Sequence, residues 1–239
     1  METLLRSLLG FLPDETLVRL EFFYNLGKFT DLKNPRTFNE KIQWMKLYDR
    51  NPLMTLYTDK YEVRKIVESK IGAHVLNELY GVFERVDEVD FDSLPESFVL
   101  KATHGSGWNI IVKDKSVFEG EEAKEKMRKW LGSSFYAKKR EWAYKDIQPR
   151  IICEKYMENK DGSLNDYKFY CFGGTPHFIQ VDVHRYTGHS RAYYSLDWKK
   201  LGFFMVKNTK KKKILPYEKE LEPPESLADM VEGDLVRVF

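Results

Sequence analysis

The pattern that most clearly suggests binding chemistry is a lysine followed by a glycine-rich turn, within residues 97–115. Lys101 lies near the end of an apolar run, and the turn His-Gly-Ser-Gly occupies residues 104–107. Because glycine has no Cβ, the backbone N–H groups of such a turn can converge on an anion, and the lysine adds a positive charge nearby. The pattern indicates a phosphate-binding turn, and a plain hairpin with a glycine tip is the alternative that the spacing leaves open.

Two better-known phosphate-binding motifs do not match this turn. A Walker A loop would continue with Gly-Lys-Ser/Thr, whereas Trp108 and Asn109 follow here. A dinucleotide-binding fingerprint leads into a helix, whereas the apolar run Ile110–Val112 predicts a strand.

A second candidate stretch covers residues 150–172. The apolar run Ile151–Cys153 leads into Glu154 and Lys155, an acidic segment follows, and Lys168 lies in the next predicted strand. Acidic groups after a strand can hold the hydroxyls of a ribose, and the backbone of the connecting segment can bind the edge of an adenine. A solvated loop between two strands is the alternative.

The elements that would position these residues can be read from hydrophobic periodicity and capping signals. Four helices are predicted first: Leu5–Leu12, Asp14–Gly27, one that begins at a capping box formed by Thr37 and Glu40, and one from about Thr58 to Gly72.

Strand patterns and one further helix follow. They are Leu79–Phe83, Phe98–Leu100, Ile110–Val112, a helix from about Glu121, Ile151–Cys153, a hairpin of Asp166–Phe172 and His177–Val183 around Gly173-Gly174, and Arg191–Ser195. Asn208–Pro224 is predicted to be a loop, because it holds a lysine run and three prolines. Interleaved helices and strands indicate an α/β or α+β fold.

Together the two candidate stretches resemble the nucleotide-binding layout of the ATP-grasp superfamily. The sequence is most similar to those of the TupA-like proteins, which are named for teichuronopeptide biosynthesis and occur in bacterial capsule and surface-polysaccharide loci. The resemblance spans roughly Asn34–Asp197. The matching segments are TDKYEVRKIVESKIG, LPESFVLKATHGSGWNIIVKDK and REWAYKDIQPRIICEKYMENKDGSLNDYKFYCFGGTPHFIQVDVHR.

The resemblance implies an α+β, two-lobed, ATP-grasp-like fold. It implies a helical segment over residues 1–50, an ATP-grasp-like domain over 51–239, and a hinge between the lobes near 154–158. Lys101 would contact the α- and β-phosphates of ATP under a mobile glycine-rich lid, Lys113 or Lys115 would add charge, and Glu158 or Asp161 would hold the ribose. The implied nucleotide-binding residues are Lys101, His104, Gly105, Ser106, Gly107, Lys113, Glu154, Lys155, Met157 and Asp161.

On the acceptor side, the resemblance implies roles for Lys168, Asp182, His184 and Arg185, with Lys168 and Arg185 as the catalytic residues. ATP would phosphorylate a carboxylate and an amine would then displace the phosphate, so no protein nucleophile is needed. An arginine suits this chemistry because its guanidinium group binds oxyanions through two hydrogen bonds. The implied cofactors are ATP and Mg²⁺.

One departure from the family concerns the metal ligands. In the family, a strand near the C-terminus has a sequence similar to VRVD, and the next strand contains a Gly-Glu pair. The carboxylates of this aspartate and glutamate bind magnesium. Here Phe239 stands where the aspartate is expected, and the glutamate-bearing strand is missing. The expectation is a chain truncated at the C-terminus, with unknown metal ligands, weak ATP binding and poor turnover.

Composition limits the remaining classes. Of the 239 residues, 39 are Lys or Arg and 37 are Asp or Glu, a balance that argues against nucleic acid as a partner. Two cysteines exclude a disulfide framework or a four-cysteine zinc site. No apolar run approaches the roughly 20 residues of a membrane span, and no signal-peptide pattern is present, so a cytoplasmic protein is expected.

Three functions follow as expectations. The first is an ATP-dependent carboxylate–amine ligase of bacterial cell-surface or capsular polysaccharide synthesis, with a carboxylate-bearing sugar or amino acid as acceptor. The second is a glycosyltransferase-like enzyme, although the one spaced Asp-x-Asp pair, at residues 90–92, precedes a Leu-Pro turn. The third is a degenerate module that binds a nucleotide or glycan without catalysis.

Overall fold

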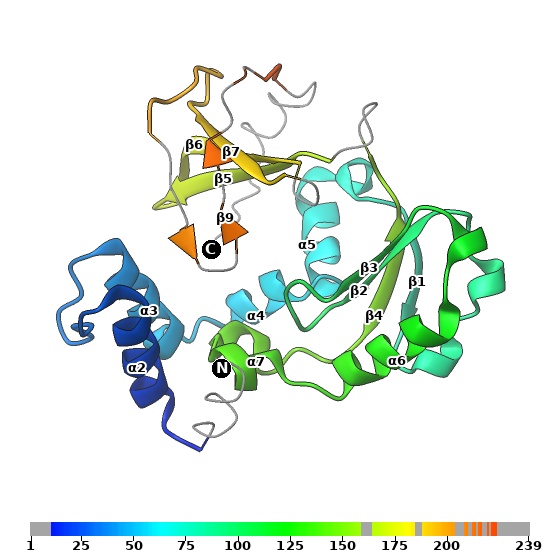
Figure 1. Ribbon diagram of the computed structural model, residues 1–239, viewed down its shortest axis with the longest axis horizontal. Helices are drawn as coiled ribbons and strands as arrows, with labels where there is room; N and C mark the ends of the chain where they lie inside the picture. Colours follow the sequence, from blue (N-terminus) through cyan, green and yellow to red (C-terminus); the bar gives the residue numbers. More distant parts are fainter. Residues whose placement is uncertain are drawn as a thin grey trace. The chain divides into compact units, whose positions relative to one another are not determined.

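The computed structural model of the chain contains two compact units, Met1–Tyr156 and Met157–Phe239 (Figure 1). It describes residues 11–158, 164–184, 188–203, 208–209, 212–213, 215–216, 219 and 221–223. A four-stranded sheet lies in each unit. Together with the helices of the first unit, these sheets confirm the predicted α+β class.

The first unit begins with helices that follow the local signals in the sequence. They are α2 (Asp14–Leu26), α3 (Phe38–Tyr48), α4 (Pro52–Thr58) and α5 (Glu62–Ile71). Gly27 ends α2 in the left-handed conformation (φ 68°), which glycine adopts without strain. Thr37 and Glu40 form the predicted capping box of α3. The helix predicted over Leu5–Leu12 lies almost entirely outside the described residues.

The helix predicted from Thr58 is wrong at its start. Thr58 ends α4, and α5 begins at Glu62. Asp59 separates the two helices, because its carboxylate accepts hydrogen bonds from the N–H groups of Tyr61 (2.9 Å) and Glu62 (3.4 Å). A side chain that satisfies the first N–H groups of a helix favours a new start at that point.

An antiparallel sheet forms the centre of the first unit, with strand order β1-β4-β2-β3. Its strands are β1 (Leu79–Phe83), β2 (Phe98–Ala102), β3 (Asn109–Val112) and β4 (Ile151–Lys155). Helix α6 (Gly120–Leu131) covers one face, where Met127 packs in a core with residues such as Phe98, Leu100 and Cys153 (Figure 1).

Alternation along the strands places the candidate residues on the opposite face of this sheet. Lys101 pairs with Ile152 of β4 and with Asn109 of β3, and Val99 pairs with Glu154. Because side chains two residues apart point to the same face, Lys101 and Glu154 share the face that lies away from the core.

Short helices lie between the longer elements of the first unit. They are η1 (Ala73–Val75), η2 (Val86–Glu88), η3 (Phe91–Ser93), η4 (Lys115–Val117), α7 (Phe135–Lys139) and η5 (Trp142–Tyr144). Phe135 of α7 packs against the ring of Trp108, which follows the glycine-rich turn, at a centroid distance of 5.7 Å.

The second unit contains a sheet with strand order β10-β7-β6-β5. Its strands are β5 (Asp166–Phe172), β6 (Thr175–Val183), β7 (Ser190–Tyr194) and β10 (Leu215–Pro216). The predicted hairpin of β5 and β6 is confirmed: Gly173 and Gly174 both have positive φ (60° and 84°), as its two-residue turn requires. Ile179, Val181 and Tyr194 form the core on one face, which leaves Lys168, Asp182 and Arg191 on the other.

The loop predicted over Asn208–Pro224 is partly wrong. The described residues there include β8 (Asn208–Thr209) and β9 (Lys212–Lys213), which pair with each other, and β10, which pairs in parallel with β7. Pro216 is compatible with β10 because that strand lies at the edge of the sheet, where a missing N–H group is tolerated.

Within the described part of the chain, no helix combines the length and the apolar character needed to cross a membrane.

Candidate functional site

The glycine-rich turn of residues 104–107, hereafter the glycine turn, connects β2 to β3. Ala102 donates its N–H to the carbonyl of Trp108 (3.0 Å), and Thr103 donates to the carbonyl of Arg150 (2.9 Å), so the base of the turn is closed. Toward the other described residues, the N–H groups of Gly105, Ser106 and Gly107 make no hydrogen bond. Three consecutive N–H groups at a tight turn can bind an anion such as phosphate.

His104 is buried beneath the turn. Its Nε2 lies 2.8 Å from the carbonyl oxygen of Trp130 at the end of α6, and its ring contacts Trp108 edge to face. Burial lowers the pKa of His104, which favours the neutral imidazole. The side chain therefore anchors the turn to α6.

Gly105 packs against the ring of Trp108 so closely that a Cβ at this position would overlap the indole. We expect Gly105→Ala to displace Trp108 and to lower the free energy of unfolding by about 1–3 kcal/mol, the usual range for overpacking. Urea denaturation checks this, with Gly132→Ala as a control because its added Cβ would make an ordinary contact. Equal losses in the two variants would contradict the close packing.

Lys60 contacts the turn from the α4–α5 junction, and the sequence did not single it out. Its Nζ donates to the carbonyl oxygens of Ala102 (3.0 Å), Thr103 (3.4 Å) and Gly105. Desolvation, with a smaller contribution from the Lys101 ammonium group, lowers the pKa of Lys60 to about 8. The available signal was the Asp-Lys pair in TDKYEVRKIVESKIG, where Asp59 starts α5 and so places the next side chain.

Lys101 and Glu154 form an ion pair across β2 and β4. The Nζ of Lys101 lies 2.6 Å from Oε2 of Glu154, and Nη1 of Arg64 lies 2.8 Å from Oε1. Both carboxylate oxygens of Glu154 are therefore paired with cations, and its side chain is only 9% exposed to solvent. Arg64, on α5, is a second residue that sequence reasoning missed. Lys101 is 32% exposed and stays accessible to a ligand.

Three more predicted residues lie at or after strand ends: Lys113 follows β3, Lys155 ends β4 and Met157 comes after β4. The Nζ of Lys113 is 5.3 Å from the ring centroid of Tyr156, and Nζ of Lys155 is 3.5 Å from Glu78. Met157 is exposed and is the first residue of the second unit. The first unit thus brings Lys101, the glycine turn and Glu154 onto one sheet. Lys113 and Lys155 lie at the other end of the strands, beside the start of β2.

Lys168 belongs to the second unit, within a charged cluster centred on Asp182. Nζ of Lys168 lies 2.7 Å from one Asp182 oxygen, and Nε of Arg191 lies 2.6 Å from the other. Lys168 also contacts Asp166. Burial alone would raise the pKa of Asp182, but hydrogen bonds from Arg191, Lys168 and His189 hold it well below its usual range. The predicted residues Asp161 and Arg185 lie outside the described part.

The described residues do not fit a magnesium site. Magnesium prefers several oxygen ligands in octahedral geometry. Both oxygens of Glu154 and both of Asp182 are engaged by cationic side chains. Among the positions that the structure describes, no three His, Cys, Asp or Glu residues gather in a way that could hold a metal ion. No catalytic step is therefore assigned to a metal here.

Comparison with known proteins gives one match. The model of the TupA-like ATPgrasp family matches residues 40–235, which is most of the chain. No curated protein and no solved structure matches the chain.

Proposed function

Since the chain belongs to the TupA-like ATPgrasp family, we propose that it is an ATP-dependent carboxylate–amine ligase of bacterial cell-surface or capsular polysaccharide synthesis. The family supports the general role of an ATP-dependent ligase. The observation that supports nucleotide binding most strongly is the glycine turn, with three N–H groups beside the accessible ammonium group of Lys101. Further elements of the proposal are a cytoplasmic location and an acceptor that is a carboxylate-bearing sugar or amino acid.

The proposed reaction has two balanced steps. A carboxylate oxygen of the acceptor attacks the γ-phosphorus of ATP, the bond between that phosphorus and the bridging oxygen breaks, and ADP leaves with an acyl phosphate as the other product. An amine then attacks the acyl carbon, the bond from that carbon to the phosphate oxygen breaks, and the nitrogen loses a proton. The products are an amide, ADP and phosphate. Such transfer depends mainly on positioning and on charge neutralisation by cations.

In this proposal, Lys101 and the glycine turn bind the phosphates, while Glu154, Lys155 and Met157 border the adenine. The two lobes hinge near residues 154–158, and the division of the chain between Tyr156 and Met157 supports that position. Lys168 and Arg185 face the transferred phosphoryl group. Asp161 holds the ribose, and Lys113 adds charge near the phosphates.

A nucleotide-binding module without turnover is the second candidate. The occupied carboxylates of Glu154 and Asp182 favour it, because neither is available to a metal ion in the arrangement seen. The glycosyltransferase expectation gains no such support: Asp90 of the Asp-x-Asp pair accepts a hydrogen bond from the N–H of Asp92 (3.0 Å) and so caps η3.

Trapping of the acyl phosphate tests the ligase proposal. With ATP, magnesium, hydroxylamine and a panel of uronic and amino acids, we expect a hydroxamate and an equal amount of ADP for at least one acid. Neither product should form without the acid, and Lys101→Ala should reduce both. Saturable ATP binding with no hydroxamate for any acid would favour the binding module. Hydrolysis or transfer from a nucleotide sugar would favour the transferase.

A further inference from the structure

Helix α2 has apolar residues on two opposite faces. Its inner face packs into a small core through Val18. On the other side Leu20, Phe23 and Tyr24 are exposed, and their i, i+3, i+4 spacing puts them in one stripe. A helix at the surface of a globular protein usually has a polar outer face, and one that is apolar all round is normally covered. The outer stripe of α2 therefore indicates an interaction surface.

Phe29 extends this stripe beyond the end of the helix. Its ring stacks on that of Phe23, with the two centroids 4.6 Å apart and the planes inclined by 21°. Phe29 and Tyr24 are each 70% exposed. Contiguous exposed apolar side chains mark interaction sites, whereas single ones scattered over a surface need no explanation. We call Leu20, Phe23, Tyr24 and Phe29 the aromatic face of α2.

The connection from α2 to α3 adds positive charge beside the aromatic face. Within residues 27–36, Lys28, Lys33 and Arg36 are exposed cations, and Asp31 is the single acid. The Asp31 carboxylate accepts two backbone N–H groups of the same connection, both at 3.0 Å. Lys28 and Arg36 form no ion pair with a carboxylate in the described part of the chain. The connection, hereafter the basic connection, thus carries an excess of positive charge.

The acids of α2 do not offset this charge on the aromatic face. Asp14 lies 3.3 Å from Nε of Arg140, on α7. Glu15 accepts a hydrogen bond from the hydroxyl of Tyr48 (2.7 Å), on α3. Glu21, the remaining acid of the helix, is three residues beyond the buried Val18 and shares its side of α2. The aromatic face therefore has no negative charge of its own.

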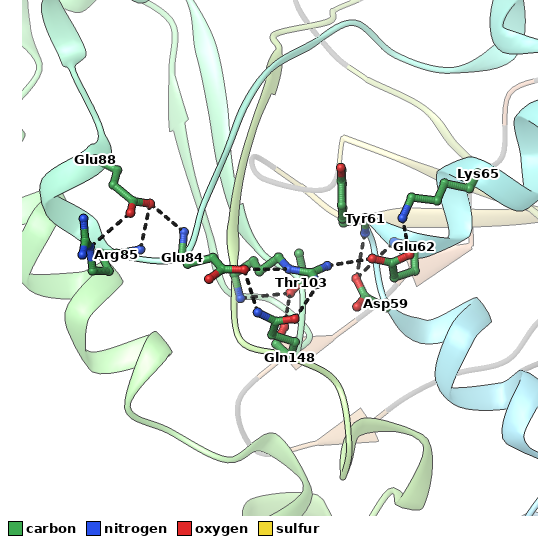
Figure 2. Close-up of polar contacts among 10 residues, drawn as sticks. Asp59, Tyr61, Glu62, Lys65, Glu84, Arg85, Glu88, Thr103 and Gln148 are labelled. Carbon is green, nitrogen blue, oxygen red and sulfur yellow. Dashed lines mark hydrogen bonds and ion pairs between the residues drawn. The ribbon is translucent and has the colours of Figure 1, made fainter.

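Two other exposed cations of the first unit are neutralised locally. Nζ of Lys65 lies 2.8 Å from Glu62, and Nε of Arg85 lies 3.1 Å from Glu88, as Figure 2 shows. A cation that is paired with a neighbouring carboxylate exerts little net attraction on a distant partner. The cations of the basic connection that lack such a pair are therefore better placed to attract an anionic surface.

We propose that the aromatic face of α2 and the basic connection bind the surface of a membrane that contains anionic lipids. Aromatic and aliphatic side chains enter the boundary between head groups and acyl chains, while lysine and arginine are attracted to anionic head groups. A symmetric second copy fits less well, because it would bring two basic connections together. This role goes beyond the proposed ligase reaction, since the family model matches only from residue 40 onward.

Sedimentation of the full chain with lipid vesicles tests the proposal. We expect binding to vesicles of phosphatidylglycerol and phosphatidylcholine, and little to vesicles of phosphatidylcholine alone. Raising the salt from about 0.1 M to about 1 M shortens the screening distance from about 10 Å to about 3 Å and should weaken the binding. Lys28→Gln combined with Arg36→Gln should lower the partition coefficient about 25-fold, because each charge near an anionic surface contributes about fivefold.

Matched variants separate this surface from general charge and hydrophobicity. Lys65→Gln combined with Arg85→Gln removes the same charge from paired cations and should leave vesicle binding nearly unchanged. Phe29→Ser should lower the partition coefficient at least about tenfold, since it removes a large ring from the aromatic face. Val117→Ser, at a position that is 77% exposed outside this face, should have little effect.

Several results would overturn the proposal. One is the absence of binding to either kind of vesicle. Another is equal weakening by the two double variants, which would assign the binding to other charges, such as the lysine run at residues 210–213. Without vesicle binding, a dimer in analytical ultracentrifugation that Phe29→Ser abolishes would show that a second copy covers the face. A lower thermal unfolding midpoint of Phe29→Ser, again without vesicle binding, would show that another segment of the chain covers it.

Discussion

Lys101→Ala is expected to weaken ATP binding about tenfold to a hundredfold. A hydrogen bond to a charged group contributes about 1.5–3 kcal/mol, and Lys101 would make such a bond to the phosphates. Its side chain is 32% exposed, and it lies on β2, the strand that leads into the glycine turn. Calorimetric titration of the parent and the variant with ATP measures the difference.

Two controls make this result specific. Lys126→Ala removes a lysine from an exposed i,i+4 ion pair on α6 and should leave the affinity unchanged. Glu154 keeps its contact with Arg64 after the loss of Lys101, so the buried carboxylate is not left alone and the fold should persist. Equal affinities of the parent and Lys101→Ala would contradict a phosphate-binding role for this residue.

Asp182→Asn is expected to give the largest loss of stability. The Asp182 carboxylate is almost fully buried and is held by Lys168, Arg191 and His189. Removing one partner from a buried charge cluster typically costs about 3–5 kcal/mol, because the remaining charges stay buried without compensation. Thermal unfolding followed by circular dichroism should show a lower midpoint for the variant.

The pH dependence of this loss has a defined sign. Hydrogen bonds hold the pKa of Asp182 well below its usual range, so its contribution is fully present above the unfolded value of about 3.9. The contribution disappears as the pH falls toward the folded pKa, and the parent and the variant should then converge. Asp197→Asn is the matched control, since that carboxylate is 58% exposed. A variant at position 182 that melts like the control would contradict the burial of this charge.

Local signals in the sequence predicted much of the fold. The capping box at Thr37 and the two-glycine turn after Phe172 depend on neighbouring residues alone, and both form as expected. Helix α4 was not predicted, and the helix predicted from about Thr58 begins only at Glu62, after the Asp59 side chain has accepted the N–H group of Tyr61. The pairing of Leu215 with Ser190 was missed because it joins residues far apart in the sequence.

In the candidate site, too, local features were predicted and contacts between distant residues were missed. Lys101 and the glycine turn could be predicted because they lie within one short segment of the sequence. Lys60 and Arg64 reach their partners across 42 and 90 residues, so no local pattern reveals the contacts. Arg191 was read only as part of a strand, although its pairing opposite Asp182 makes it a main partner of that carboxylate.

The central claim is that the glycine turn binds the phosphates of ATP, and NMR amide shifts during titration test it most directly. ATP and ADP should shift the N–H resonances of Gly105, Ser106 and Gly107 with saturation, whereas adenosine, which lacks phosphate, should leave them nearly unchanged. Saturable ATP binding with these three resonances unmoved, or no ATP binding at all, would contradict the account.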